Sequence, residues 1–176
     1  LILTKILKRA KELTEKGVIL PSSEPLLFFM QHKITIETFD SETLDLFSQL
    51  DDFDVISAIK SWQKHNDFIL SSLSKMIINR DLLKIKLSEE KVSTEDLHQL
   101  KERFATANNI TLAETNYFIF KGKIKNQAYS KVAEPIRILK KDKTIEDVVE
   151  ASDQLNLKSL SKFVTKYYLC FPKQLV

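Results

Sequence analysis

The residues best suited to chemistry in this chain form the segment Arg80-Asp81-Leu82-Leu83-Lys84. Arg presents a planar fork of N–H donors that matches a phosphate, and Lys adds a compact positive charge four residues later. At the junction of a helix and a strand, Arg80 and Lys84 can face one groove and hold a polyphosphate. The same residues also suit the C-terminal end of a helix, whose negative dipole end favours basic side chains. The pattern alone leaves both interpretations open.

Other residues able to act in catalysis or to bind a metal are isolated from one another. His32, His65 and His98 have no second His or Cys at ligand spacing, whereas a zinc or two-metal site needs several convergent ligands. We therefore predict no catalytic residue and no metal site in this chain. Cys170 lies in an apolar stretch without an activating partner in sequence, so we expect a buried and unreactive thiol.

A carboxylate cluster, Asp51, Asp52 and Asp54, has two possible roles. Carboxylate oxygens are ligands that hard cations prefer. The cluster also stands where a helix is expected to begin, and Asp is a favoured N-cap whose charge suits the positive end of the helix. Capping is sufficient to explain the pattern, and we favour it.

Aromatic and basic residues alternate around Tyr117, Phe118, Phe120, Lys121 and Lys123. Sheets that bind nucleic acid combine exposed aromatic rings with positive charge in this way. The glycine-aromatic signature of an RNA-recognition sheet is missing, so we do not favour nucleic acid as a partner.

The net charge of +3 conceals two oppositely charged regions. Residues 31–60 contain seven acidic and two basic residues, and residues 121–143 contain eight basic and two acidic residues. Such opposed fields can orient partners, although most charge runs are solvated faces.

Composition is that of an ordinary globular protein, with 43% hydrophobic and 29% charged residues among 176. The two glycines stand far apart, which argues against a phosphate-binding glycine loop. One Cys fits a reducing cytoplasm, and no apolar run approaches the roughly 18 residues that span a bilayer. Because the chain begins at Leu1 with a helical pattern, we expect a piece of a longer protein.

The first half of the chain has helical periodicity, and Trp62 falls on an apolar stripe that indicates core packing. Pro25 suits a helix's first turn, and Gly17 suits a helix end. The expected helices cover 3–16, 26–31, two short acidic segments capped by Thr35 and Ser41, a segment after Asp51 or Asp52 with Val55, Ile56, Ile59 and Trp62 buried, and a segment after Asn66 or Asp67.

The second half alternates between strand and helix patterns. Expected strands cover 83–87, 117–120, 136–139 and 164–171, and expected helices follow Ser93 and Thr144. The order β-α-β-β-α-β predicts a ferredoxin-like arrangement. The predicted fold is therefore a mainly α half, residues 1–80, followed by an α+β subdomain, residues 81–176.

Several short motifs resemble the region that follows the catalytic core in HD-domain phosphohydrolases, specifically the dNTP triphosphohydrolase-like branch that includes the sterile-alpha-motif/HD dNTPases. They are Leu50-Asp51-Asp52-Phe53-Asp54, Trp62, Asp67, Leu73 and Arg80-Asp81-Leu82-Leu83-Lys84. The Leu3–Gly17 helix and the closing Lys166-Tyr167-Tyr168-Leu169-Cys170 strand are similar to that branch's tail as well.

The resemblance implies a metal-dependent enzyme that holds a divalent metal with a His…His-Asp…Asp set and hydrolyses a nucleotide phosphoester. That ligand set is absent from this sequence, so the metal is expected in an HD core outside it. The chain then serves as a non-catalytic C-terminal portion, whose residues 1–80 pack on the core and which takes part in homo-oligomer contacts. By the same resemblance, Arg80 and Lys84 are expected to contact the phosphates of a regulatory nucleotide, with a contribution from the basic hairpin Arg137–Lys143.

Two rival hypotheses remain. A freestanding protein–protein interaction module would present its apolar faces to another protein. A nucleic-acid-binding module would use residues 117–143, with steeply salt-dependent affinity.

Overall fold

The computed structural model describes residues 1–126, 136–151 and 164–175. The first half is helical: α1 (Ile2–Glu15), α2 (Glu24–Gln31), α3 (Ser41–Gln49), α4 (Asp52–Trp62) and α5 (Phe68–Ile78). The second half is mixed: β1 (Lys84–Ser88), α6 (Thr94–Asn108), the 3-10 helix η1 (Glu114–Tyr117), β2 (Phe120–Asn126), β3 (Arg137–Leu139), β4 (Ile145–Asp147), α7 (Val148–Ala151), β5 (Val164–Phe171) and the 3-10 helix η2 (Lys173–Leu175). The expected mixture of a helical half and an α+β half is confirmed. None of the described helices has the length and apolar character needed to cross a bilayer.

Side-chain caps explain where most of the helices begin. Asp51 accepts hydrogen bonds from the amides of Phe53 and Asp54, and the Asp54 carboxylate accepts one from the Asp51 amide, which completes a capping box. The Asp67 carboxylate caps α5, and the Ser93 hydroxyl caps α6. The capping role predicted for the aspartate cluster at the start of α4 is therefore confirmed.

Two capping predictions in the acidic segment were wrong. Asp40, rather than Ser41, caps α3 by accepting a hydrogen bond from the Thr43 amide. Thr35 begins a turn instead of a helix, because its amide donates to the Thr38 hydroxyl at 2.8 Å and closes the chain locally. A Ser or Thr side chain that bonds to nearby backbone favours turns as readily as helix starts.

Trp62 lies at the centre of the helical core and is fully buried. Its indole N–H donates to the Pro21 carbonyl at 2.9 Å, so the polar edge of the ring is satisfied. Within α4 the buried stripe runs through Ala58 and Ile59, while Ile56, expected to be buried, is 39% exposed. One hydrophobic cluster spans both halves of the chain, and it includes Ile6, Leu13, Ile59, Trp62, Leu70, Leu73, Phe104, Phe118, Ile119 and Phe171.

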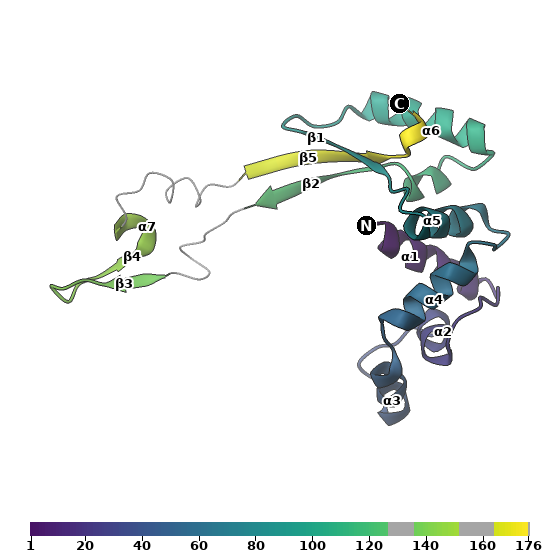
Figure 1. Ribbon diagram of the computed structural model, residues 1–176, viewed down its shortest axis with the longest axis horizontal. Coiled ribbons are helices and arrows are strands. Elements are labelled where there is room, and N and C mark those ends of the chain that lie inside the picture. The colour runs from purple at the N-terminus through teal and green to yellow at the C-terminus, as the bar shows by residue number, and fades with distance from the viewer. Residues whose placement is uncertain (127–135, 152–163, 176) are drawn as a thin grey trace.

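Three strands form an antiparallel sheet in the order β1-β5-β2, and β3 pairs with β4 in a separate hairpin (Figure 1). A ferredoxin-like domain would join its four strands in one sheet, so that arrangement is not confirmed. The hairpin closes on itself because Lys140 and Thr144 are bonded across a tight turn in which Lys143 has a φ of 67°. This turn leaves 137–139 paired with 145–147 rather than with the larger sheet.

Two predicted elements begin with a different secondary structure. The strand predicted from residue 117 is preceded by a 3-10 helix, and the helix predicted after Thr144 is preceded by a strand. Residues 114–117 form a 3-10 helix, and β2 begins at Phe120 because the amides of Phe118 and Ile119 bond back to the Thr115 carbonyl. A short apolar run cannot be distinguished from a buried turn by periodicity. Thr144 precedes strand β4 instead of capping a helix, and α7 begins after Asp147, which accepts from the Val149 amide.

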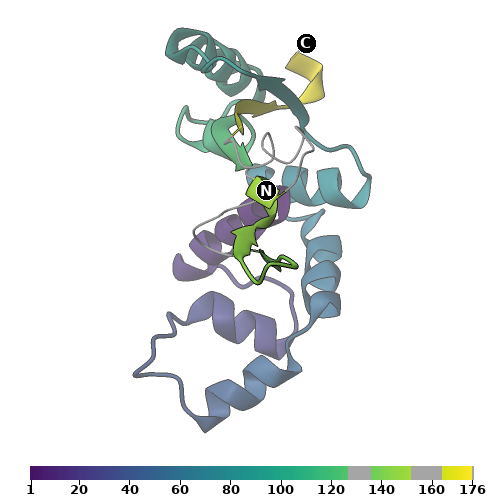
Figure 2. The same ribbon diagram turned by 90° about the vertical axis from the view of Figure 1, so that its left-hand side faces the viewer.

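The five helices of the first half, α1 to α5, extend away from the three-stranded sheet in one direction (Figure 2). Both views place α3 at the end of the helical half that is farthest from the sheet. Helices α1 and α5 lie at the opposite end, next to the sheet. Secondary structure changes from helix to strand between Ile78 and Lys84, at the predicted boundary. The division into two domains stays a prediction.

Candidate functional site

Arg80 occupies a strained backbone position directly after α5. Its φ is 57°, in the left-handed region, and its amide donates to the Ile77 carbonyl at 3.2 Å. Helices commonly end with Gly at such a position, because a side chain there costs about 1–2 kcal/mol. Here the strained residue is Arg80, which is exposed to solvent. Backbone strain of this kind is concentrated at functional sites.

Lys84 is the first residue of β1 and is also exposed. Four extended residues span at most about 14 Å, so the Cα atoms of Arg80 and Lys84 lie within that distance. Asp81, which lies between them, forms an ion pair with Lys173 at 2.9 Å. Within the described part of the chain, neither Arg80 nor Lys84 forms an ion pair, so both charges remain available to an anion.

The strand register continues this positive charge across one face of the sheet. Residues directly opposite each other in an antiparallel pair place their side chains on the same face. Lys84 lies opposite Phe171, and Lys121 lies opposite Leu169. The resulting lysine face contains Lys84, Lys86, Lys121, Lys123 and Lys125, together with Tyr167 and Leu169. No Asp or Glu occurs in β1, β2 or β5.

The opposite face of the same sheet is mainly apolar, with the exposed Lys166 opposite Ile124, and we call it the apolar face. Ile85, Leu87 and Ile124 are each between 51% and 56% exposed on it. The ring of Tyr168 lies across Gly122 there, where any Cβ would be 2.4 Å from the ring. Uncovered apolar area of this kind favours a contact with another surface.

A buried ion-pair network joins the two halves of the chain, and the sequence interpretation missed it. Arg9, 9% exposed, donates from Nε and Nη2 to both carboxylate oxygens of Asp67, at 3.1 and 2.6 Å. Glu12 and Glu114 each lie 3.4 Å from the same guanidinium. The signal was present, because Arg9 falls within the apolar stripe of α1, next to Ala10.

Electrostatics in this network favour the charged forms. Burial alone would raise the pKa of Asp67, but the hydrogen bonds from Arg9 and from the Leu70 amide, with the Arg9 charge, outweigh it and lower the pKa. The hydrogen bond to Asp67 raises the pKa of Arg9 despite burial. Burial, with the nearby Glu12 carboxylate, raises the pKa of Tyr117. Arg9 and Asp67 therefore stay ionised and the Tyr117 phenol stays neutral, which suits a structural role.

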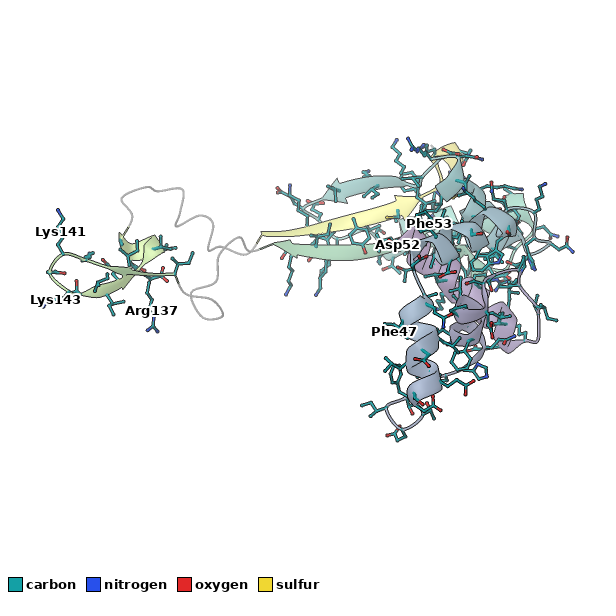
Figure 3. The ribbon with its side chains drawn as sticks, turned by 60° about the horizontal axis from the view of Figure 1, so that its bottom comes forward. Phe47, Asp52, Phe53, Arg137, Lys141 and Lys143 are labelled. Carbon is teal, nitrogen blue, oxygen red and sulfur yellow. The ribbon has the colours of Figure 1, made fainter. Side chains whose placement is uncertain are left out.

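The helical half carries a cluster of aromatic rings far from the sheet. Phe28, Phe29, Phe47 and Phe39 form successive edge-to-face contacts, with ring centroids 5.3, 6.1 and 6.4 Å apart. Phe47 is 57% exposed, and Phe53 at the start of α4 is 83% exposed. Figure 3 labels both on the helical half. We call Phe39, Phe47 and Phe53 the exposed aromatic surface.

The remaining candidates from the sequence separate in space. Tyr117 and Phe118 are 7% and 0% exposed, so they are not rings on an open sheet that bases can stack on. On the β3–β4 hairpin, Lys140 forms an ion pair with Glu146, and Arg137 lies opposite Asp147. Arg137, Lys141 and Lys143 are exposed on this hairpin (Figure 3). The basic run 121–143 is thus divided between two sheets, and its residues 127–135 lie outside the described residues.

A metal ion requires a group of several convergent His, Cys, Asp or Glu side chains. Among residues 1–126, 136–151 and 164–175, no three His, Cys, Asp or Glu side chains converge as a metal site would require. Cys170 is 2% exposed, and burial raises the pKa of its thiol.

Comparison with known proteins identifies one informative solved structure. It is the crystal structure of a phosphohydrolase, BT4208, from Bacteroides thetaiotaomicron VPI-5482, with a TM-score of 0.86 and 40% sequence identity. The chain is similar to part of a phosphohydrolase. The match covers 97% of this chain but 43% of the phosphohydrolase chain.

A second relative is the uncharacterized protein YwfO of Bacillus subtilis (strain 168), 34% identical over 83 residues. That match covers 46% of this chain and 17% of YwfO. No family model matches the chain. The match therefore spans less than half the length of each of these two proteins.

Proposed function

We propose that this chain is the non-catalytic C-terminal portion of a metal-dependent HD-type phosphohydrolase, similar to the dNTP triphosphohydrolases, and that it works in the cytoplasm. The observation that carries the proposal is the 40% identity to a phosphohydrolase across 97% of this chain, with more than half of the longer protein left unmatched. A whole-chain match to a fraction of an enzyme is what an accessory portion would give. The divalent metal, which would activate the attacking water, and its ligands belong to the unmatched portion in this proposal.

The helical half is suited to pack on a catalytic core. Its exposed aromatic surface includes Phe47 and Phe53, whose side chains are each more than half exposed to solvent. A monomeric protein rarely leaves contiguous apolar patches of this kind uncovered. In the proposal, the catalytic core covers this surface.

The apolar face of the sheet suits a second contact, between subunits of a homo-oligomer. Ile85, Leu87 and Ile124 alternate with lysines along β1 and β2, so one sheet offers an apolar face and a charged face. Homodimer interfaces are more apolar than the general surface.

Regulation would act through Arg80 and Lys84, which hold the phosphates of an effector nucleotide between subunits. The support is the pair of available cations within about 14 Å of one another and the strained backbone that presents Arg80. Guanidinium and ammonium groups together match a polyphosphate.

Calorimetric titration of the full-length protein with a deoxynucleoside triphosphate tests the regulatory site. Arg80→Ala and Lys84→Ala should each weaken effector binding about tenfold, since each removes a hydrogen bond between charged groups. Lys75→Ala, which removes an exposed lysine from α5, is the matched control and should leave the affinity unchanged. Unchanged affinity in both test variants would eliminate the site.

Catalysis is tested separately. The full-length protein with Mg²⁺ or Mn²⁺ should release triphosphate from a deoxynucleoside triphosphate, and the 176-residue portion alone should not. Failure of the full-length protein to hydrolyse any nucleotide phosphoester would overturn the enzyme assignment while leaving effector binding measurable.

The exposed aromatic surface also supports a second candidate, a freestanding protein–protein interaction module. This candidate requires the 176 residues to stay monodisperse alone, whereas a portion detached from its core should self-associate through uncovered apolar area. Sedimentation of the isolated chain and of a Phe47→Asp variant distinguishes the two: self-association that Phe47→Asp relieves supports the accessory portion.

A further inference from the structure

A cavity of about 460 Å³ lies between the β1–α6 connection and the paired strands β2 and β5. Its volume falls in the range of roughly 300–1,000 Å³ typical of small-molecule sites. Three ammonium groups surround it, from Lys91, Lys121 and Lys123, and Tyr167 and Val92 supply apolar wall. All of its lining residues are described, and none of them is acidic.

The strand register builds this cavity from alternating residues. Lys121 and Lys123 lie opposite Leu169 and Tyr167, so they share the lysine face with the Tyr167 ring. Residues two apart on a strand are separated by about 6.7 Å, so Lys121 and Lys123 line the cavity from neighbouring positions on one face of β2. Gly122 between them faces the other way, and its lack of a side chain accommodates Tyr168 on the apolar face.

Among the residues that the structure describes, none forms an ion pair with Lys91, Lys121 or Lys123. Lys121 donates to the Val92 carbonyl at 3.1 Å, a partner without charge. Glu95 and Asp96 follow in the first turn of α6 without lining the cavity.

At the start of α6, the amides of Glu95 and Asp96 already donate to the Ser93 hydroxyl, so these two donors are engaged within the helix cap. The charged groups that line the cavity are the three lysines, and Tyr167 supplies the aromatic ring beside them.

From this arrangement we infer that the cavity binds a nucleoside phosphate, with the phosphate between Lys91 and Lys123 and the base against Tyr167. Ammonium groups pair with the phosphate, and aromatic rings stack on bases of any sequence. The site is formed within one chain, does not include Arg80 or Lys84, and stands whether or not the proposed function holds.

Calorimetric titration of the full-length protein with adenosine 5′-monophosphate, adenosine and inorganic phosphate tests the inference. Adenosine monophosphate should bind most tightly because it engages both the lysines and the ring. Lys91→Ala and Lys123→Ala should each weaken its binding about tenfold. Tyr167→Ala should reduce its affinity to that of inorganic phosphate, whereas Tyr167→Phe keeps the ring and should preserve binding.

Matched controls come from the same lysine face. Lys86 and Lys125 lie on that face but do not line the cavity, so Lys86→Ala and Lys125→Ala should change the affinity less than twofold. Arg80→Ala should leave this binding intact. The inference is overturned if adenosine monophosphate does not bind, if Lys91→Ala and Lys123→Ala bind it normally, or if all four lysine variants lose affinity equally.

Discussion

Replacing Asp67 with Asn tests whether the buried ion pair between Arg9 of α1 and Asp67 at the start of α5 stabilises the helical half. The side chains of Arg9 and Asp67 are 11% and 14% exposed, and two hydrogen bonds of 2.6 and 3.1 Å join them. Asp67→Asn keeps an oxygen that can cap α5 but removes the negative charge beside a buried guanidinium. Breaking a buried pair from one side costs about 3 kcal/mol.

The reverse change and the double change separate the pair from its surroundings. Arg9→Met leaves a buried carboxylate without a partner, and we expect a similar loss of about 3 kcal/mol. Arg9→Met/Asp67→Asn leaves no uncompensated charge between these two positions. Its cost should fall at least 1 kcal/mol short of the sum of the single changes, as coupled neighbours do.

Urea unfolding followed by the fluorescence of Trp62, the single tryptophan of these 176 residues, measures the three variants. For a chain of this size, 3 kcal/mol corresponds to a melting temperature lower by roughly 6–12 °C. The surface pair Lys8–Glu12, 3.9 Å long with Lys8 66% exposed, is the control, and Lys8→Met should cost under about 0.5 kcal/mol. Single variants of Arg9 and Asp67 that resemble this control, or additive costs in the double variant, would refute the reasoning.

Further predictions concern pH, packing, strain and reactivity. Because the folded state lowers the pKa of Asp67, its contribution is complete above the unfolded value of about 3.9 and is lost as the pH falls through the folded value; the stability advantage over Asp67→Asn should therefore shrink below about pH 4, measured by urea midpoints at several pH values. Gly122→Ala should cost about 1 kcal/mol in thermal unfolding, because its Cβ would meet the Tyr168 ring at 2.4 Å and the ring must shift; Tyr168→Ala in the same chain should remove that difference. Arg80→Gly should raise stability by about 1 kcal/mol by relieving the positive φ, while effector affinity in calorimetry falls. Cys170, 2% exposed with a raised thiol pKa, should react with a disulfide reagent only as the protein unfolds.

Most of the secondary structure could be predicted from local sequence patterns. The caps at Asp51, Asp67 and Ser93 act through hydrogen bonds to amides two or three residues away, so their signal is contained in a few letters of sequence. Strand β5 was predicted at 164–171 and occurs there, because β-branched and aromatic residues are followed by Pro172. The same reasoning failed at Thr35, where two local hydrogen-bonding schemes compete.

Contacts between residues far apart in the chain could not be predicted from the sequence. Alternation in residues 84–88 fixes which side chains share a face, but it does not state which strand lies beside β1. Pairing with β5, some 80 residues later, depends on the whole core. The lysine face and the cavity near Tyr167 exist only because of that pairing. Arg9 was overlooked because a charged residue in an apolar stripe is usually read as a helix edge rather than as half of a buried pair.

Helix α5 links the structural and the regulatory proposals. Asp67 caps its start by accepting a hydrogen bond from the Leu70 amide, and the same carboxylate pairs with Arg9. Arg80 follows the end of the helix, about 16 Å away for eleven residues. If the ion pair at the start of α5 only stabilises the fold, Asp67→Asn should lower the melting temperature. The effector affinity, measured well below the unfolding transition, should then stay within twofold. If the helix also sets where Arg80 is presented, affinity should fall together with stability. A measurement of both quantities on this one variant therefore decides whether the ion pair holds the fold alone or positions the phosphate ligand as well.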